Sequence, residues 1–308
     1  MSDMGMRVAV VVASVRRAEE IGQLLQALSR QTKKPEALIL SVSREADLPL
    51  DLPAGVTIVT GTPSLPAQRN RGLDLVQDRC DVVVFYDDDF LPAKDSLQCI
   101  SEFFLTHPLL VGATGHLLAD GINGPGLPYQ EALEMLATYE ASPKPTLINE
   151  NFLCAYGCNM AFRCEAIGTR RFDENLPKYG WQEDMDFAGQ LSAVGKVIRT
   201  NAFAGVHRGV KNGRGQGADL GFSQIVNPVY LAAKGTMTKR KAASLILRNL
   251  IANHVKSLWP EPYIDRMGRL RGNWDGILHI LHGNLDPTDL PSSHKSAKRG
   301  SCATTFTP

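Results

Sequence analysis

Long hydrophobic runs are absent from this chain. No stretch reaches about 18 uninterrupted apolar residues, so we expect no transmembrane helix. An excess of charge of one sign is also absent: 33 lysines and arginines face 32 acids, which gives a formal net charge of +1. No overall field attracts nucleic acid, and we expect no nucleic-acid partner. Because 44% of the 308 residues are apolar, a large core is available for one domain or two.

Paired C-x-x-C motifs are missing too, although the sequence contains six cysteines. Cys154 and Cys158 are four positions apart and Cys164 follows six positions later, which is not the usual spacing of a zinc site. A zinc site is therefore the less favoured interpretation, and free thiols in a reducing compartment are expected. We expect a cytoplasmic protein, either free or held peripherally on the inner face of the membrane.

The sequence does contain an apolar run, residues 82–86, that leads directly into Asp87, Asp88 and Asp89. The run predicts a buried strand of a parallel sheet. The acids then follow its carboxyl end, where open α/β sheets bind ligands. Three adjacent carboxylates repel one another, and Mg²⁺ or Mn²⁺ bound through their oxygens would offset that repulsion. The alternative is an acidic surface turn.

Strand-like and helix-like segments alternate along the first 208 residues. This alternation predicts an α/β fold with a doubly wound, mostly parallel sheet and right-handed crossovers, so that the acids lie at a switch point. The expected strands are 7–14, 37–42, 56–59, 82–86, 109–116, 155–163, 196–200 and 204–208. The expected helices include 19–30, a segment that ends near 78, 96–106, 130–140 and one that begins near 183.

The last third of the chain has a different character. Its first part, 209–222, is glycine-rich and basic, which predicts a flexible loop that is either a mobile lid or a disordered segment. Residues 223–290 predict a helical C-terminal extension with long helices at 238–259 and 264–285. The first of these helices is basic and amphipathic; it would suit an anionic membrane surface, but ordinary packing across the catalytic domain is favoured. The polar stretch 291–308 predicts a disordered tail.

Seven short motifs occur in an order that resembles the inverting family-2 glycosyltransferases, in particular those of bacterial exopolysaccharides and other cell-surface glycans. They cover roughly residues 6 to 210, and each is weak alone, whereas the ordered set is specific. The motifs are Val11–Arg17, Leu28–Thr32, Gly61–Gly72, Tyr86–Asp89, Gly157–Ala161, Phe172–Glu174 and Gly180–Asp184.

The resemblance implies the GT-A nucleotide-diphospho-sugar transferase fold over residues 1–208, with a nucleotide-sugar half at 1–117 and an acceptor half at 118–208. The implied reaction moves a sugar from a nucleotide-diphospho-sugar, most often a UDP-sugar, to a hydroxyl of a glycan or lipid-linked acceptor in polysaccharide biosynthesis. The implied cofactor is a divalent metal, Mn²⁺ or Mg²⁺.

The resemblance also implies roles for individual residues. Asp184 becomes the base that deprotonates the acceptor, with Trp181 and Glu183 beside it for acceptor binding. Asp89 becomes the metal ligand, and His207 is either a further metal or diphosphate contact or an ordinary core histidine. The implied donor-binding residues are Ala13, Ser14, Arg16, Arg69, Asp87 and Asp88.

Two features depart from the family pattern. Residues 40–44, at the end of the second expected strand, contain no acid, although the family usually reads the base with one there. The identity of the base, usually uracil, is therefore open. Arg16 adds a charge beside the expected nucleotide, where it either contacts phosphate or is simply solvated.

Two other functions compete with glycosyl transfer. A sugar-nucleotide nucleotidyltransferase of similar fold needs a glycine-rich triphosphate loop after the first strand, and residues 14–17 contain no glycine. A non-catalytic GT-A-like carbohydrate-binding protein would be expected to lose Asp89 or Asp184, and both are present.

Overall fold

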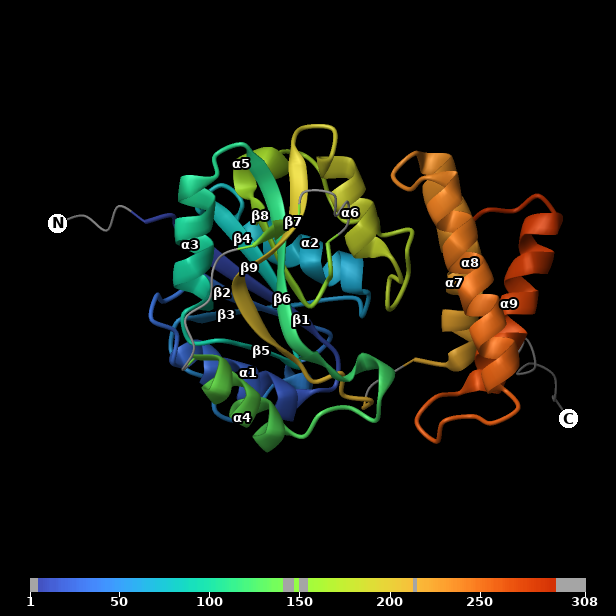
Figure 1. Cartoon of the computed structure of the whole chain (residues 1–308), viewed down its shortest axis with the longest axis horizontal. Coiled ribbons are helices and arrows are strands. Elements are labelled where there is room, and N and C mark those ends of the chain that lie inside the picture. The colour runs from blue at the N-terminus through green and yellow to red at the C-terminus, as the bar shows by residue number, and fades with distance from the viewer. Residues whose placement is uncertain (1–4, 141–146, 150–154, 213–214, 292–308) are drawn as a thin grey trace, which may run out of the picture. The chain divides into compact units, whose positions relative to one another are not determined.

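The computed structural model describes residues 5–140, 147–149, 155–212 and 215–291. The chain divides into two units, whose elements are labelled in Figure 1. Unit 1 is Met1–Asp173 with Asp184–Gly213, and unit 2 is Glu174–Glu183 with Arg214–Pro308. Almost all of the predicted disordered tail lies outside the described residues. The predicted domain boundary at residue 208 and the two functional halves before it stay predictions.

Unit 1 alternates strands with helices as the sequence predicts. Its strands are β1 (Val8–Ser14), β2 (Ala37–Val42), β3 (Val56–Thr60), β4 (Val82–Asp87), β5 (Phe90–Pro92), β6 (Leu110–Asp120), β7 (Ile148–Asn149), β8 (Asn159–Arg163) and β9 (Lys196–His207). Its helices are α1 (Ala18–Ser29), α2 (Leu65–Val76), α3 (Ser96–Thr106), α4 (Tyr129–Glu140), α5 (Cys164–Ile167) and α6 (Glu183–Leu191), with 3₁₀ turns at Glu45–Asp47 and Gly121–Asn123.

The strands of unit 1 form one sheet in the order β3-β2-β1-β4-β8-β6-β9-β5, and β7 pairs with β9. The first four strands in this order pair in parallel. β6 has the direction of β4 because both pair antiparallel with β8, and β9 runs parallel to β6. The strands β5, β7 and β8 run the opposite way. The predicted mostly parallel α/β sheet is therefore confirmed in the described part of the chain.

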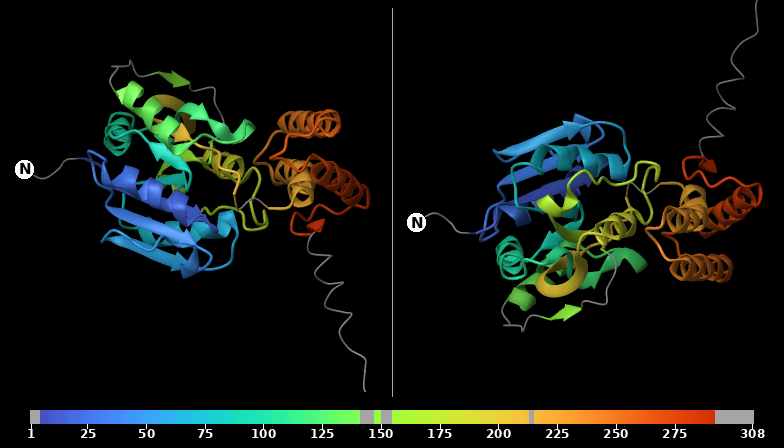
Figure 2. Two further views of the ribbon diagram at one scale, coloured as in Figure 1. Left: turned by 90° about the horizontal axis from the view of Figure 1, so that it is seen from below. Right: turned by 90° about the horizontal axis from the view of Figure 1, so that it is seen from above.

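Both faces of this sheet are buried, which explains why its central strands are apolar without interruption. Val10 and its neighbours two positions away pack with Leu24 of α1 and Phe104 of α3. Val11 points to the other face and packs with Leu73 of α2, in the same apolar cluster as α6. Helices cover the sheet on both sides, and the layers can be followed in Figure 2.

Four strands that run in the same direction end at the same edge of the sheet. β1 ends at Ser14, β4 at Asp87, β6 at Asp120 and β9 at His207. β8 runs the other way, so its beginning and the turn before it, 156–158, lie at this edge as well. Polar residues from distant parts of the sequence are thus collected at the carboxyl edge of a largely parallel sheet.

The predicted strands differ from the structure in several places, of which three bear on the site and on the strands beside it. The prediction of separate strands at 196–200 and 204–208 is wrong, because β9 continues through both and absorbs the irregular middle by register shifts against β6. The strand predicted at 155–163 begins only at Asn159, since a turn precedes it. The short strand β5 was not predicted; its pairing with the end of β9, not its sequence, makes it a strand.

Unit 2 consists of three helices with the segment 174–183. The helices are α7 (Gly217–Lys234), α8 (Lys239–Lys256) and α9 (Arg266–Leu281), which confirms the predicted helical C-terminal region. The predicted flexible loop 209–222 is wrong over its last residues, because α7 begins at Gly217. The side chains of Thr238 and Asp265 cap α8 and α9 by accepting backbone N–H groups, so both helix starts are encoded locally.

Glycine in α7 and α9 allows a close approach of the two helices. A Cβ atom on Gly221 would lie 2.1 Å from the carbonyl oxygen of Arg269, and one on Gly272 would lie 1.9 Å from that of Ala218. These contacts are with backbone, which cannot move aside as a flexible side chain can. Gly221, one of the glycines that suggested a loop, therefore serves helix packing.

Among the described residues, no helix is both long and apolar enough to cross a membrane. The cysteines at 80, 99, 158 and 164 are free thiols, as expected. No cysteine belongs to the group of possible metal ligands found in the described part of the chain, so the zinc interpretation gains no support there.

We predict that Gly272→Ala destabilises unit 2 by roughly 1–3 kcal/mol, because its methyl group forces α9 away from α7. Urea unfolding followed by tryptophan fluorescence measures this unit selectively, since all three tryptophans, at 181, 259 and 274, belong to it. Gly215→Ala is the matched control, because a Cβ atom there meets nothing within 4 Å. Equal unfolding midpoints for the two variants would contradict the close helix approach.

Candidate functional site

The three acids that follow the apolar part of β4 lie in different environments. Asp87 is partly exposed, whereas Asp88 and Asp89 are buried. A buried carboxylate needs an opposite charge or hydrogen-bond donors around it. Each acid has its own set of partners from other elements of unit 1, and these partners define the site.

Arg69 on α2 is the partner of Asp87. Its Nη2 atom lies 2.9 Å from Asp87 Oδ1 and donates to the carbonyl oxygen of Gly157, also at 2.9 Å. The guanidinium is buried over the rings of Phe85 and Phe172, at 5.9 and 5.6 Å from their centroids. Arg69 therefore holds both Asp87 and the turn before β8 in place.

Asp88 is held from the side of β1. Ser14 Oγ donates to Asp88 Oδ2 at 2.5 Å, and Arg17 Nη1 lies 2.7 Å from Asp88 Oδ1. Burial raises the pKa of Asp88 to about 7, although the nearby Arg17 opposes the rise. These contacts tie β1 to β4. The predicted role of Ser14 and Asp88 in donor binding stays a prediction.

Asp89 faces His207. His207 Nε2 lies 3.3 Å from Asp89 Oδ1 and 3.9 Å from Asp87 Oδ2. One ligand atom from each of these three residues lies within 4.8 Å of the others. Two carboxylates and an imidazole form a donor set that suits a divalent cation such as Mn²⁺. The structure thus brings together the predicted metal ligands Asp89 and His207 and adds Asp87 to them.

Asp120, at the end of β6, fixes the ring of His207. His207 Nδ1 lies 2.8 Å from Asp120 Oδ1, and the Tyr156 hydroxyl donates to Asp120 Oδ2 at 2.8 Å. With Nδ1 engaged, Nε2 is the ring nitrogen turned toward the acids. A carboxylate that orients a metal-binding histidine in this way is common in metal sites. Asp120 was not among the predicted site residues, although it is an acid at a strand end, the same signal that indicated Asp87.

The pKa values of the two buried neighbours Asp88 and Asp89 are shifted in opposite directions. Burial acts to raise the pKa of Asp89, but the hydrogen bond and charge of His207 lower it to about 2. Burial acts to lower the pKa of His207, but Cys158, Asp120 and Asp89 raise it well above its ordinary value. Asp89 therefore stays ionised at neutral pH, as a metal ligand must, whereas His207 has to release its proton before its Nε2 can bind a cation.

The residues directly after β9 also hold Asp89. The Val210 amide donates to Asp89 Oδ2 at 2.7 Å, and Arg17 Nη1 lies 3.4 Å from the same oxygen. Arg17 donates further to the carbonyl oxygens of Val210 and Asn212, at 3.0 and 2.8 Å. Asp89 Oδ2 is thus held by the protein, while Oδ1 faces His207. The described start of the predicted loop 209–222 is bound by these contacts.

Of the two arginines after β1, it is Arg17, and not the predicted Arg16, that contacts the buried acids. Arg16 has a φ of 59° and an exposed side chain, whereas Arg17 reaches the buried acids. The left-handed conformation of Arg16 sets the direction of both side chains, and the sequence does not show it. Ala13, at the end of β1, is in register with Asp87. Nucleotide contacts of Ala13 and Arg16 stay predictions.

Asp184 lies at the start of α6. Its Oδ2 accepts from the Gly157 amide at 2.9 Å and its Oδ1 from the Met185 amide at 2.8 Å. Burial raises its pKa, although the charge of Arg69 opposes the rise. A raised pKa makes this carboxylate a better proton acceptor at neutral pH. Because Gly157 also binds Arg69 through its carbonyl, a short chain of contacts connects Asp184 with the three metal-ligand candidates.

The two predicted acceptor-binding residues, Trp181 and Glu183, belong to unit 2. The Trp181 carbonyl accepts from Asn227 Nδ2 on α7 at 2.8 Å, and Glu183 is buried. Between them Gln182 has a φ of 75°, a conformation that costs a non-glycine residue free energy and often occurs at functional sites. Their role in acceptor binding stays a prediction.

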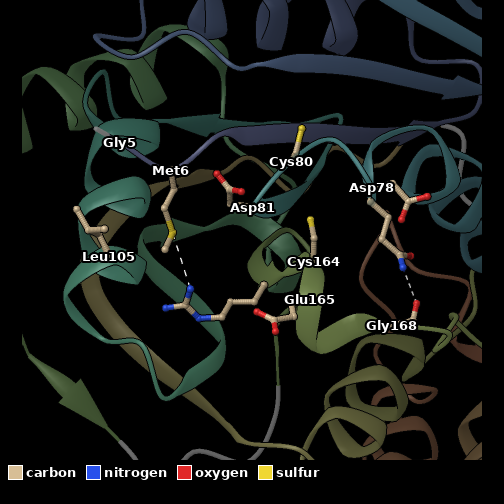
Figure 3. A pocket seen from close by; sticks show the side chains of 11 residues that line it. Gly5, Met6, Asp78, Cys80, Asp81, Leu105, Cys164, Glu165 and Gly168 are labelled. Carbon is tan, nitrogen blue, oxygen red and sulfur yellow. Dashed lines mark hydrogen bonds between the residues drawn. The ribbon is translucent and has the colours of Figure 1, made fainter. Parts of the chain in front are cut away.

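A pocket of about 580 Å³ lies at the other edge of the sheet (Figure 3). Residues just before β1 and β4, such as Met6 and Asp81, line it. Two of its charged groups have partners: Asp81 pairs with Arg7 at 2.8 Å, and Arg163 donates to backbone carbonyls. None of the predicted site residues lines this pocket.

The partly buried Asp87 and Asp89 follow β4 beside its switch point with β1, which is where open α/β sheets bind ligands. No family model matches the chain, and no curated protein matches it significantly. Solved structures do match it, and those described below are glycosyltransferases.

The mannosyltransferase PcManGT from Pyrobaculum calidifontis, solved with GDP-Man and Mn²⁺, has a TM-score of 0.51 at 14% identity, over 89% of this chain and 88% of that one. S. aureus TarS 1–349, solved with UDP-GlcNAc, has a TM-score of 0.53 at 14% identity, over 96% and 92%. A longer TarS chain is covered over 44% of its length, so the present chain spans less than half of it. The similarities to PcManGT and to TarS 1–349 confirm the predicted GT-A fold.

We predict that Asp120→Asn weakens Mn²⁺ binding about 10- to 100-fold, because the neutral amide orients His207 less strictly and makes it a poorer ligand. Titration calorimetry with MnCl₂ and the protein alone measures the affinity without any catalytic reaction. Asp51→Asn, a change of the same kind at an exposed position, should leave the affinity unchanged. If both variants bind Mn²⁺ like the wild type, Asp120 has no part in the metal site.

Proposed function

We propose that this protein is a metal-dependent inverting glycosyltransferase. It moves a sugar from a nucleotide-diphospho-sugar, a UDP-sugar in the first place, to a hydroxyl of a glycan or lipid-linked acceptor in cytoplasmic polysaccharide biosynthesis. The observation that carries the proposal is the placement, at one edge of a GT-A sheet, of three metal-ligand candidates and a separate carboxylate with a raised pKa. Similar structures hold UDP-GlcNAc, or GDP-Man with Mn²⁺, which supports the choice of donor class.

In the proposed site, Asp87, Asp89 and His207 hold the divalent metal. Bound Mn²⁺ or Mg²⁺ supplies positive charge against the negative charge that develops on the leaving diphosphate. The chain contributes the geometry: Asp120 turns His207 Nε2 toward the acids, and the Val210 amide and Arg17 hold the second oxygen of Asp89. These groups are set before the donor arrives, so little reorganisation is needed during the reaction.

The proposed donor site lies at the carboxyl ends of the neighbouring strands β1 and β4. Ala13 and Ser14 offer backbone groups to the base and ribose, and Arg16 lies exposed beside them, where it can approach the diphosphate. Asp87 contacts the ribose as well as the metal. Arg69 orients Asp87 through their ion pair, so its contribution to donor binding is partly indirect.

Asp184 is the proposed base. An inverting transfer needs a carboxylate that takes the proton from the acceptor hydroxyl as the oxygen attacks the anomeric carbon and the diphosphate leaves. The Gly157 and Met185 amides fix its orientation and leave lone pairs on both oxygens for the incoming proton. Trp181 would offer a flat apolar surface to an acceptor sugar, and Glu183 a hydrogen bond to it.

The competing functions explain fewer of these features. A nucleotidyltransferase would bind a triphosphate through glycine-rich backbone after β1, but that turn carries Arg16 and Arg17 instead. A non-catalytic carbohydrate-binding protein has no need for a carboxylate with a raised pKa or for an oriented histidine. Transfer of a sugar is the function that uses both.

We predict that the wild type releases nucleoside diphosphate from at least one sugar nucleotide in the presence of Mn²⁺, and that Asp89→Ala lowers this rate about a hundredfold or more. A panel of UDP- and GDP-sugars with detection of the free diphosphate measures the rate and identifies the donor. Asp51→Asn serves as the control for a surface acid. If no donor is bound or hydrolysed and Asp89→Ala changes nothing, the proposed function is wrong.

We predict that Asp184→Asn lowers the rate of sugar transfer about 10²- to 10⁴-fold and keeps the affinity for the donor, because the amide cannot accept the proton. Calorimetric titration with the donor separates binding from transfer. In the wild type the raised pKa of Asp184 predicts that the rate falls on the acid side at a pH above the ordinary aspartate range, since a protonated carboxyl is no base. Loss of donor binding in Asp184→Asn would remove Asp184 from the role of base.

A further inference from the structure

The helices α8 and α9 carry large apolar side chains on the sides that face away from their own unit. On α8, Leu247, Ile251 and Val255 recur every four residues, and each is more than half exposed. On α9, Trp274 and Leu278 recur in the same way and are also more than half exposed. We call these residues, with Trp259 just after α8, the outer face of α8–α9.

The two rows of apolar residues are neighbours. The rings of His254 on α8 and Trp274 on α9 meet edge to face, with centroids 5.8 Å apart. Next to them, Asn253 Nδ2 on α8 donates to Asn273 Oδ1 on α9 at 2.9 Å. The outer face is therefore one continuous surface across two helices. Exposed apolar patches of this kind mark sites of interaction.

Packing within unit 2 does not need these residues. The inner side of α8 is formed by Ala242, Leu245 and Asn253, which are buried, and Asn253 also donates to Gln224 of α7. The inner side of α9 is formed by small and polar residues that meet α7, such as Gly272. Each helix is thus apolar on a second side that has no partner among the described residues of the unit.

The charges beside the outer face are mainly positive. α8 contains five lysines and arginines and no acid; the side chains of Arg240 and Arg248 are exposed, and Lys256 pairs with Glu261 at 2.8 Å. On α9, Arg271 is exposed close to Trp274, and Asp275 is the one acid of that helix. An apolar row flanked by basic residues, with tryptophan among them, is typical of helices that lie in the interface of an anionic bilayer.

We propose that the outer face of α8–α9 docks this protein on the surface of an anionic lipid bilayer. Both helices would lie in the plane of the interface, with the apolar row in the acyl region and the arginines at the headgroups. A second copy of the chain fits less well, because a two-fold contact would bring Arg248 and its basic neighbours against their own like charges. The inference goes beyond the proposed sugar transfer and does not depend on it.

Vesicle flotation with the full chain tests the proposal. The wild type should float with phosphatidylglycerol vesicles and not with phosphatidylcholine vesicles, and added sodium chloride should weaken the binding. The triple variant Ile251→Ser, Val255→Ser, Trp259→Ser should bind at least about tenfold more weakly. The double variant Arg240→Glu, Arg248→Glu should lose roughly fivefold or more per residue, because about 1 kcal/mol per basic residue comes from the anionic surface.

The control removes apolar residues of unit 1 that are even more exposed. Leu50→Ser with Leu109→Ser should float like the wild type, since these residues lie on loops of unit 1 and do not belong to the outer face. Far-ultraviolet circular dichroism checks that all variants are folded. The proposal fails if the wild type does not float with phosphatidylglycerol, or if the outer-face variants float as well as the control. It also fails if those variants instead abolish a self-association measured by sedimentation, which would make the face a contact between copies.

Discussion

The burial of adjacent carboxylates at the end of β4 is the constraint on which the site of this protein depends. Buried like charges destabilise a fold unless each has its own partner. Arg69 serves Asp87, Ser14 and Arg17 serve Asp88, and His207 with the Val210 amide serves Asp89. These partners come from β1, α2, β9 and the residues after β9. The acids therefore hold the carboxyl edge of the sheet together, and the edge in turn holds the acids in a fixed geometry.

The same contacts give the three acids different chemistry. Burial raises the pKa of Asp88, which accepts a hydrogen bond from Ser14 of β1. Asp89 stays ionised, and one of its oxygens faces His207. Asp120 and Tyr156 hold the imidazole in the matching orientation. One arrangement thus serves stability and the proposed binding of a cation. It also leaves Asp184, reached through Gly157 and Arg69, as a separate carboxylate with a raised pKa for the proposed proton transfer.

The two units show which structural features sequence patterns can predict. Periodicity found the parallel strands and α8, and the motif order led to the GT-A fold that the solved structures confirm. The loop predicted from glycines was wrong in α7, where Gly217 and Gly221 permit close helix packing. A local pattern cannot distinguish such glycines from those of a loop. The basic helix α8 was expected to pack across the catalytic domain, which stays a prediction; within unit 2 it packs with one side only. Because its other side is apolar and exposed, we propose that this side contacts a bilayer.

The sequence by itself determined the alternation of strands and helices, the acids at the end of β4, and Asp184 at the start of a helix. These depend on local periodicity and on residue types, which can be read along the chain. Only the tertiary structure decided that Arg17, not Arg16, reaches the acids, and that Asp120 orients His207. Those contacts join residues 71 and 87 positions apart. They follow from the direction of β6 and β9 and from one left-handed residue, and no local pattern records either.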